Sequence, residues 1–142
     1  MTSTSRIAFV VLPLAMTGWL QGQVGMRAGL WENTVSASGQ TATRKACITP
    51  EQEQQSKASV ESMRESAEKS LAKNGACKLK ELTVAGATQT MIMVCGTTTI
   101  KHSTTLRADS FETNATATTP EGVKSSLIKG RRLGECPPGG VK

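Results

Sequence analysis

The stretch from residue 77 to residue 95, CKLKELTVAGATQTMIMVC, decides how this chain can fold. It holds two strand-like apolar runs on either side of Gly86, with a cysteine at each end. Because position 86 is the midpoint of the stretch, a hairpin that turns there places Cys77 opposite Cys95. The second run, TQTMIMVC, is apolar on both faces, which predicts the most buried strand of a sheet. We therefore expect an antiparallel hairpin closed by a disulfide.

The first residues of the chain have the layout of a secretory signal peptide. Arg6 provides a basic start, and the apolar run IAFVVLPLAMTGWL covers residues 7–20. A membrane-spanning helix needs about 20 apolar residues, whereas this run is shorter and is interrupted by Pro13. We expect a signal peptide over residues 1–22, cleaved between residues 22 and 26, and a periplasmic or secreted protein. An uncleaved membrane anchor is the alternative interpretation.

All 4 cysteines of the chain lie behind this signal, which is typical of a disulfide-bonded exported protein. Four cysteines allow three pairings, and the hairpin favours Cys77 with Cys95. Cys47 is then left to pair with Cys136. Each bridge adds roughly 3 to 4.7 kcal/mol in the chain-entropy model. The alternative, a nucleophilic Cys47, needs a nearby base, and the sole histidine, His102, falls on a predicted strand elsewhere.

One helix interrupts the β-type pattern. Thr49 is a good N-cap, Pro50 suits the first helical position, and Gln52 completes a capping box. An apolar stripe follows at helical spacings of three and four residues, made by Val60, Met63, Ala67 and Leu71. We expect a helix over residues 50–73 that packs on a sheet by this stripe, with a break near Ser56 as the alternative.

From Gly29 onward, the rest of the chain reads as short strands, and its abundant threonine favours them. Seven strands joined mostly by short turns predict an α+β, mainly β fold, an antiparallel up-and-down meander with one helix between strands two and three. A bridge from Cys47, after strand two, to Cys136, after strand seven, would draw the ends of the sheet together. We therefore expect a strongly curved or barrel-like sheet. It forms a single domain over residues 26–137, followed by a disordered tail at residues 138–142.

Four motifs occur together in order: AGLWENTV at residues 28–35, CITPE at residues 47–51, the hairpin with a cysteine at each end, and GRRLGEC at residues 130–136. This combination resembles a bacterial exported family known only as the domain of unknown function number 3617. The resemblance covers about residues 26–137. It implies a periplasmic or secreted β domain in a Gram-negative bacterium, and it carries no assigned activity, so no catalytic residue is implied.

Several side chains are candidates for lining a ligand cavity inside a curved sheet. By strand alternation, His102 shares a face with Ile100 and Leu106. Methionine side chains are flexible and suit an apolar groove. The candidates are His102, Met91, Met93 and Trp31. The alternative for His102 is a polar residue held by its strand neighbours.

Arg131 and Arg132 are candidates for binding an anion. Adjacent strand residues point to opposite faces, so the pair cannot bind one phosphate together from ideal geometry. One of them is expected to pair with a carboxylate such as Glu32.

The formal net charge of +6 favours weak attraction to an anionic membrane surface or an envelope polymer. Nucleic-acid binding is not expected, because stacking aromatics are scarce.

The sequence has no Gly-rich phosphate loop, serine elbow or Cys-x-x-Cys motif, and a zinc site takes three or four protein ligands. We therefore expect no enzymatic activity, no cofactor and no metal.

Two interpretations of function stay open. The first is a ligand-binding or accessory module for a small apolar or amphipathic molecule. The second is a structural or interaction domain of the envelope that binds a protein or polymer through a sheet edge or through its basic C-terminal strand.

Overall fold

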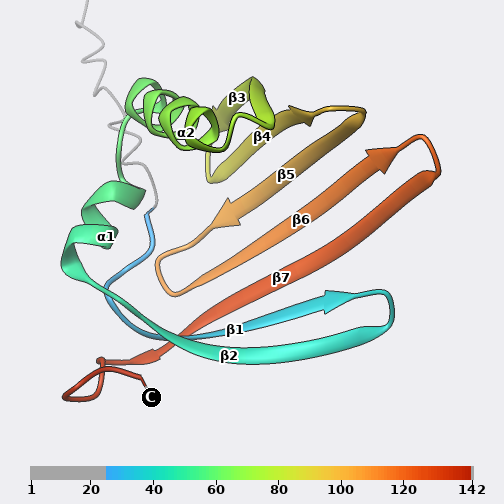
Figure 1. Ribbon diagram of the computed structural model, residues 1–142. Helices are drawn as coiled ribbons and strands as arrows, with labels where there is room; N and C mark the ends of the chain where they lie inside the picture. Colours follow the sequence, from blue (N-terminus) through green and yellow to red (C-terminus); the bar gives the residue numbers. More distant parts are fainter. Residues whose placement is uncertain (1–24, 142) are drawn as a thin grey trace, which may run out of the picture.

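The computed structural model describes residues 25–141 (Figure 1). The predicted signal peptide, residues 1–22, lies outside the described residues. The described chain forms seven strands and two helices, in the order β1 (Gly29–Ala37), β2 (Gln40–Ile48), α1 (Pro50–Ser56), α2 (Val60–Asn74), β3 (Cys77–Ala85), β4 (Thr88–Cys95), β5 (Thr98–Leu106), β6 (Ser110–Thr119) and β7 (Gly122–Gly134). The predicted α+β, mainly β class is confirmed.

The strands form one sheet in the order β2-β1-β7-β6-β5-β4-β3, and every neighbouring pair is antiparallel. The up-and-down meander therefore runs without interruption from β3 to β7. β1 then joins on the far side of β7, and β2 lies outside β1. Consecutive strands β2 and β3 are thus the two edges of the sheet, and β7 is an interior strand. The chain crosses from one edge to the other through α1 and α2 (Figure 1).

The prediction of a strongly curved or barrel-like sheet is wrong, because the sheet is open and its edge strands β2 and β3 do not pair. The expected pairing of Cys47 with Cys136 is present, but its place in the sheet differs from the expectation. Leu30 of β1 lies opposite both Cys47 of β2 and Gly134 of β7. The disulfide therefore spans one intervening strand at one end of the sheet and draws no distant edges together.

The central hairpin forms as the sequence predicts. Cys77 lies directly opposite Cys95, and the two are disulfide-bonded with a Cα–Cα distance of 4.1 Å. The register of β3 against β4 shifts between Leu79 and Glu81. This bulge explains why the apolar alternation of the strand changes phase there.

The helical segment consists of two helices, with the break near Ser56 that the sequence offered as the alternative to one continuous helix. Thr49 forms the predicted capping box, since its hydroxyl accepts from the Gln52 amide and the Gln52 side chain accepts from the Thr49 amide. α1 ends at Ser56, and Ser59 begins α2 by accepting a hydrogen bond from the Ser62 amide. The chain changes direction between the end of α1 and this second N-cap, three residues later. As a result, α2 lies beside β3 and β4 (Figure 1).

The core is thin. Trp31 and Leu82 are the buried apolar side chains of the described residues, at 0% and 3% exposure. The indole Nε1 of Trp31 donates to the carbonyl oxygen of Arg27 at 2.9 Å, and its ring lies 5.9 Å from the ring of Phe111. These contacts satisfy the one polar group of the indole and give it an aromatic neighbour.

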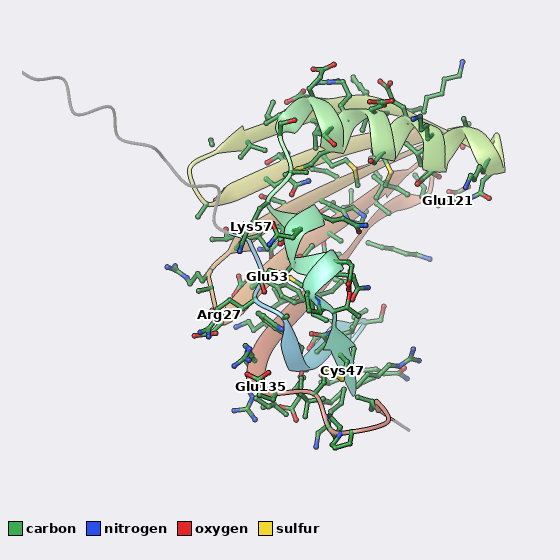
Figure 2. All side chains as sticks on the ribbon, turned by 90° about the vertical axis from the view of Figure 1, so that its left-hand side faces the viewer. Arg27, Cys47, Glu53, Lys57, Glu121 and Glu135 are labelled. Atoms are coloured by element: carbon green, nitrogen blue, oxygen red, sulfur yellow. A yellow bond between two sulfur atoms is a disulfide. The ribbon has the colours of Figure 1, made fainter. Side chains whose placement is uncertain are left out.

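Residues 26–28 are attached to α1 by polar contacts. The Met26 amide donates to Ser56 Oγ at 3.0 Å, and the Ala28 amide donates to Glu53 Oε2 at 2.8 Å. Lys57 Nζ lies 2.6 Å from Glu53 Oε1, and Figure 2 shows Glu53 on α1 and Lys57 just after its end, with Arg27 nearby. The Lys57 hydrogen bond, followed by the Ala28 amide, lowers the pKa of Glu53 from its ordinary value of 4.5. The ionised carboxylate therefore holds the entry of β1.

Glu53→Gln is expected to lower the midpoint of thermal unfolding at pH 7. This difference from the unaltered protein should become smaller as the pH falls below about 4.5. A pKa that is lowered in the folded state stabilises the fold above the unfolded value, and this stabilisation is lost as pH falls through the folded value. Unfolding of both proteins would be followed by circular dichroism from pH 3 to pH 7. Glu121→Gln, in an exposed turn far from α1 (Figure 2), is the control and should show no such pH dependence. A Glu53 effect of equal size at pH 3 and pH 7 would contradict the assignment.

Removing the longer disulfide is expected to destabilise the protein more than removing the shorter one. The bridges span 89 and 18 residues, and loop-closure entropy makes the longer loop worth about 1.4 kcal/mol more. Urea unfolding of the Cys47→Ser/Cys136→Ser and Cys77→Ser/Cys95→Ser double variants measures the difference. Equal losses, or a larger loss for the hairpin bridge, would disprove the entropic ranking.

Candidate functional site

Cross-strand pairing divides the sheet side chains into two faces. Leu79 of β3 lines a pocket of about 350 Å³ together with Leu71 of α2, and Leu82, the buried residue of β3, lies on the same side of the sheet. This side is the helix-side face. Leu79 lies opposite Met93, Met93 opposite Ile100, Ile100 opposite Ala117, and Ala117 opposite Lys124. These paired residues form one row across five strands, because directly opposite residues share a face. The other side of the sheet is called the outer face below.

The predicted cavity residues Met91, Met93 and His102 come together on the helix-side face. Met91 lies directly opposite His102, in the row next to that of Met93 and Ile100. All four side chains are half-buried. They form a methionine-containing apolar surface with one imidazole, on the two strands next to the edge strand β3.

Trp31, the fourth predicted cavity residue, is not part of this surface. The row of His102 continues through Ala115 and Ser126 to Ala37, six residues along β1 from Trp31. At about 3.3 Å per residue this places Trp31 about 20 Å away along the strand direction. Its complete burial beside Phe111 gives it a packing role.

The ring of Phe111 occupies the space above a glycine. Gly130 lies directly opposite Phe111 across the β6–β7 pair, and an added Cβ at Gly130 would lie within van der Waals overlap of the phenyl ring. The absence of a side chain at this position therefore allows the phenyl ring to approach β7 closely and reach Trp31.

The charged side chains that the strands place on the helix-side face are all basic. They are Arg44 opposite Asn33, Lys124 opposite Ala117, and Arg132 opposite Trp31. Within the seven described strands, every glutamate lies on the outer face: Glu32, Glu81 and Glu112. Arg132 is already engaged, because its Nε donates to the Ala28 carbonyl at 2.8 Å and its Nη2 lies 2.7 Å from Glu135. Arg44 and Lys124 are exposed.

The outer face carries a charged hollow of about 460 Å³ over the ends of β1, β7, β6 and β5. Arg131 lines it and donates to Glu32 Oε1 through Nε at 3.0 Å and Nη2 at 2.8 Å. Lys129 lies 3.5 Å from Glu112. Arg107 also lines the hollow, and its side chain makes no ion pair within residues 25–141. Three cations against two carboxylates leave the hollow with one excess positive charge.

The structure separates Arg131 and Arg132, as strand alternation requires. Arg131 lies on the outer face and pairs with Glu32, the carboxylate that the sequence suggested. Arg132 lies on the helix side, where the Ala28 carbonyl and Glu135 occupy it. Arg131 is therefore the one of the pair that remains exposed to an anion.

Sequence reasoning missed Arg107, Lys129 and Glu112 as neighbours of Arg131. Strand alternation does place Lys129 and Arg131 on the same side of β7, and it places Glu112 on one side of β6. The missing information was the pairing of β7 with both β1 and β6, which brings these side chains together.

No group of three or more His, Cys, Asp or Glu residues within the described part of the chain is arranged to hold a metal ion. Neither α1 nor α2, the helices found between residues 25 and 141, has the length and hydropathy to cross a lipid bilayer.

The chain belongs to the family described as "Protein of unknown function (DUF3617)", whose family model matches residues 26–136. This match confirms the resemblance that the four sequence motifs indicated. A search of curated proteins and a search of solved structures each gave no significant match.

Gly130→Ala is expected to destabilise the protein by about 1–3 kcal/mol, the usual cost of overpacking, because the new methyl group collides with the Phe111 ring. Trp31 fluorescence should change as well, because the two rings are in contact. Chemical unfolding monitored by this fluorescence gives both readouts. In a Phe111→Ala background the same Gly130→Ala change should cost much less, since the colliding ring is gone. Equal costs in both backgrounds would exclude the collision.

Proposed function

We propose that this protein is an exported binding module that holds a small anionic amphiphile against the helix-side face of its sheet. The observation that carries this proposal is an apolar, half-covered sheet face on which every strand-borne charge is basic. An apolar surface of this kind, bordered by polar groups, is typical of an interaction site.

The apolar part of the ligand would lie along the row that begins at Leu79 and passes through Met93, Ile100 and Ala117. The four strands of this row extend over about 14 Å, since neighbouring strands lie about 4.8 Å apart. Methionine adapts to ligands of different shape because its side chain is unbranched and flexible. The neighbouring Met91 and His102 widen the same surface.

The anionic end of the ligand would lie at Lys124, which ends this row on β7. Lys124 is exposed and makes no ion pair within the described residues. No glutamate of the strands shares its face, so no strand carboxylate competes with the ligand. The arrangement puts an apolar track and a cation in line, which matches an acyl chain with a negatively charged head.

Export to the periplasm or the extracellular medium is part of the proposal. The Cys47–Cys136 and Cys77–Cys95 bridges are compatible with an oxidising compartment, and the N-terminal sequence supports a signal peptide. The sequence pI of about 9.4 also favours weak association with anionic membrane surfaces, where such amphiphiles occur.

The test uses dodecanoate as the anionic probe and dodecyl maltoside as an uncharged probe with the same alkyl chain, both below their micelle concentrations. Titration of the isotope-labelled mature protein should shift the amide resonances of β4 and β5. We expect dodecanoate to bind about fivefold more tightly, because one exposed charge contact is worth about 1 kcal/mol.

Lys124→Glu should remove this preference for dodecanoate. Lys101→Glu is the matched control, because Lys101 is also an exposed strand lysine but lies on the outer face, opposite Ile92. Its effect on affinity should be less than twofold. Equal effects of the two variants would overturn the proposal. So would a stable dimer that buries β4 and β5 in the absence of any probe, as measured by sedimentation and by the same resonances.

A further inference from the structure

The two edges of the open sheet differ in how their backbone groups are protected. On the β3 edge, Arg64 Nη2 of α2 donates to the Leu82 carbonyl at 3.1 Å, and a bulge interrupts the strand between Leu79 and Glu81. Bulges and covering helices are two of the means by which proteins block an edge strand, and charged side chains are another. The β2 edge has neither a bulge nor a covering helix, since its pairing with β1 is regular over all nine residues.

The turn that precedes β2 determines which of its backbone groups face outward. Ser38 and Gly39 form a two-residue hairpin loop with φ values of 50° and 75°. In such a hairpin the closing pair, here Ala37 and Gln40, is hydrogen-bonded, and hydrogen-bonded pairs recur at every second residue. The even-numbered residues of β2 therefore bond to β1. The amides and carbonyls of Thr41, Thr43 and Lys45 point away from the sheet.

The same reasoning, applied to the β3 edge, agrees with an observed contact. The β3–β4 hairpin closes with Ala85 opposite Thr88. Ala85 is therefore hydrogen-bonded to β4. The backbone groups of Val84 and Leu82, one and three residues before it, point away from the sheet. The Leu82 carbonyl is the group that Arg64 caps.

The β2 edge is also accessible and positively charged. Every residue from Gln40 to Lys45 is exposed. Arg44 projects to the helix side and Lys45 to the outer side, and neither makes an ion pair within the described residues. β2 contains no carboxylate. The edge therefore offers unpaired backbone groups between two cations that lie on opposite faces.

We propose that the β2 edge binds an extended acidic peptide segment, which adds to the sheet as an eighth strand. The outward amides and carbonyls of Thr41, Thr43 and Lys45 would form the ladder. Neighbouring acidic residues of the peptide would face Arg44 on one side of the sheet and Lys45 on the other. A second copy of β2 is a poorer partner, because it brings the same two cations and no negative charge. This site is independent of the amphiphile proposed above.

The experiment uses a synthetic peptide of sequence Thr-Val-Thr-Glu-Asp-Thr-Val-Thr, and the same peptide with two lysines in place of Glu-Asp. Amide hydrogen exchange of the mature protein is measured by magnetic resonance with each peptide. The acidic peptide should slow exchange at least about tenfold at Thr41, Thr43 and Lys45. Exchange at Ala42 and Arg44 should stay unchanged, because these amides already bond to β1.

Two variants test the backbone and the charge separately. Thr43→Pro removes one outward N–H and should abolish the slowing, while thermal unfolding reports whether the strand survives. Arg44→Glu/Lys45→Glu should reverse the preference to the lysine peptide, with no change in the backbone.

Slowing at the outward amides by the acidic peptide alone supports the proposal. Equal slowing by both peptides would overturn the acidic specificity. Binding without slowing at Thr41, Thr43 and Lys45 would overturn strand addition. A dimer that protects the same amides in the absence of peptide would show that a second copy is the partner instead.

Discussion

Strand β1 forms hydrogen bonds with β2 on one side and with β7 on the other, and this double pairing determines the layout of the whole sheet. It makes β7 an interior strand and leaves β2 and β3 as edges. It also places Glu32 beside Arg131, and Cys47 within reach of Cys136. The charged hollow, the open edge and the longer disulfide are therefore consequences of a single strand pairing.

The structure is stabilised by its ladders and bridges more than by a large core. Trp31 and Leu82 are the buried apolar side chains of the described residues, so the hydrophobic contribution of fully buried side chains is small for a chain of this size. The helices do not seal the sheet: α2 lies beside β3 and β4, and α1 holds the entry of β1 through Glu53 and Ser56 (Figure 2). The half-covered methionine surface is the result of this incomplete cover.

Local features of the fold were predictable from the sequence, whereas the order of the strands was not. The Thr49 capping box and the Cys77–Cys95 hairpin each depend on residues close together in the chain. No local sequence signal indicates the β1–β7 pairing. A Cys47–Cys136 bridge is equally compatible with a closed barrel and with its actual position, in which it spans β1. For the candidate site, alternation placed His102 on one face with Ile100, but it could neither group His102 with Met91 and Met93 nor exclude Trp31. Its distance from them depends on the register of four strand pairs.

The β1–β7 pairing also has a consequence for how the protein folds. Leu30 and Gly134, which lie opposite each other, are 104 residues apart in the chain. Contacts between such distant segments require a large loop to close before they bring any gain, and they slow folding. During synthesis the first hairpin emerges early, yet one of its strands must wait for the last strand of the chain before its backbone is satisfied. Until then an additional unpaired edge is open to association with other chains.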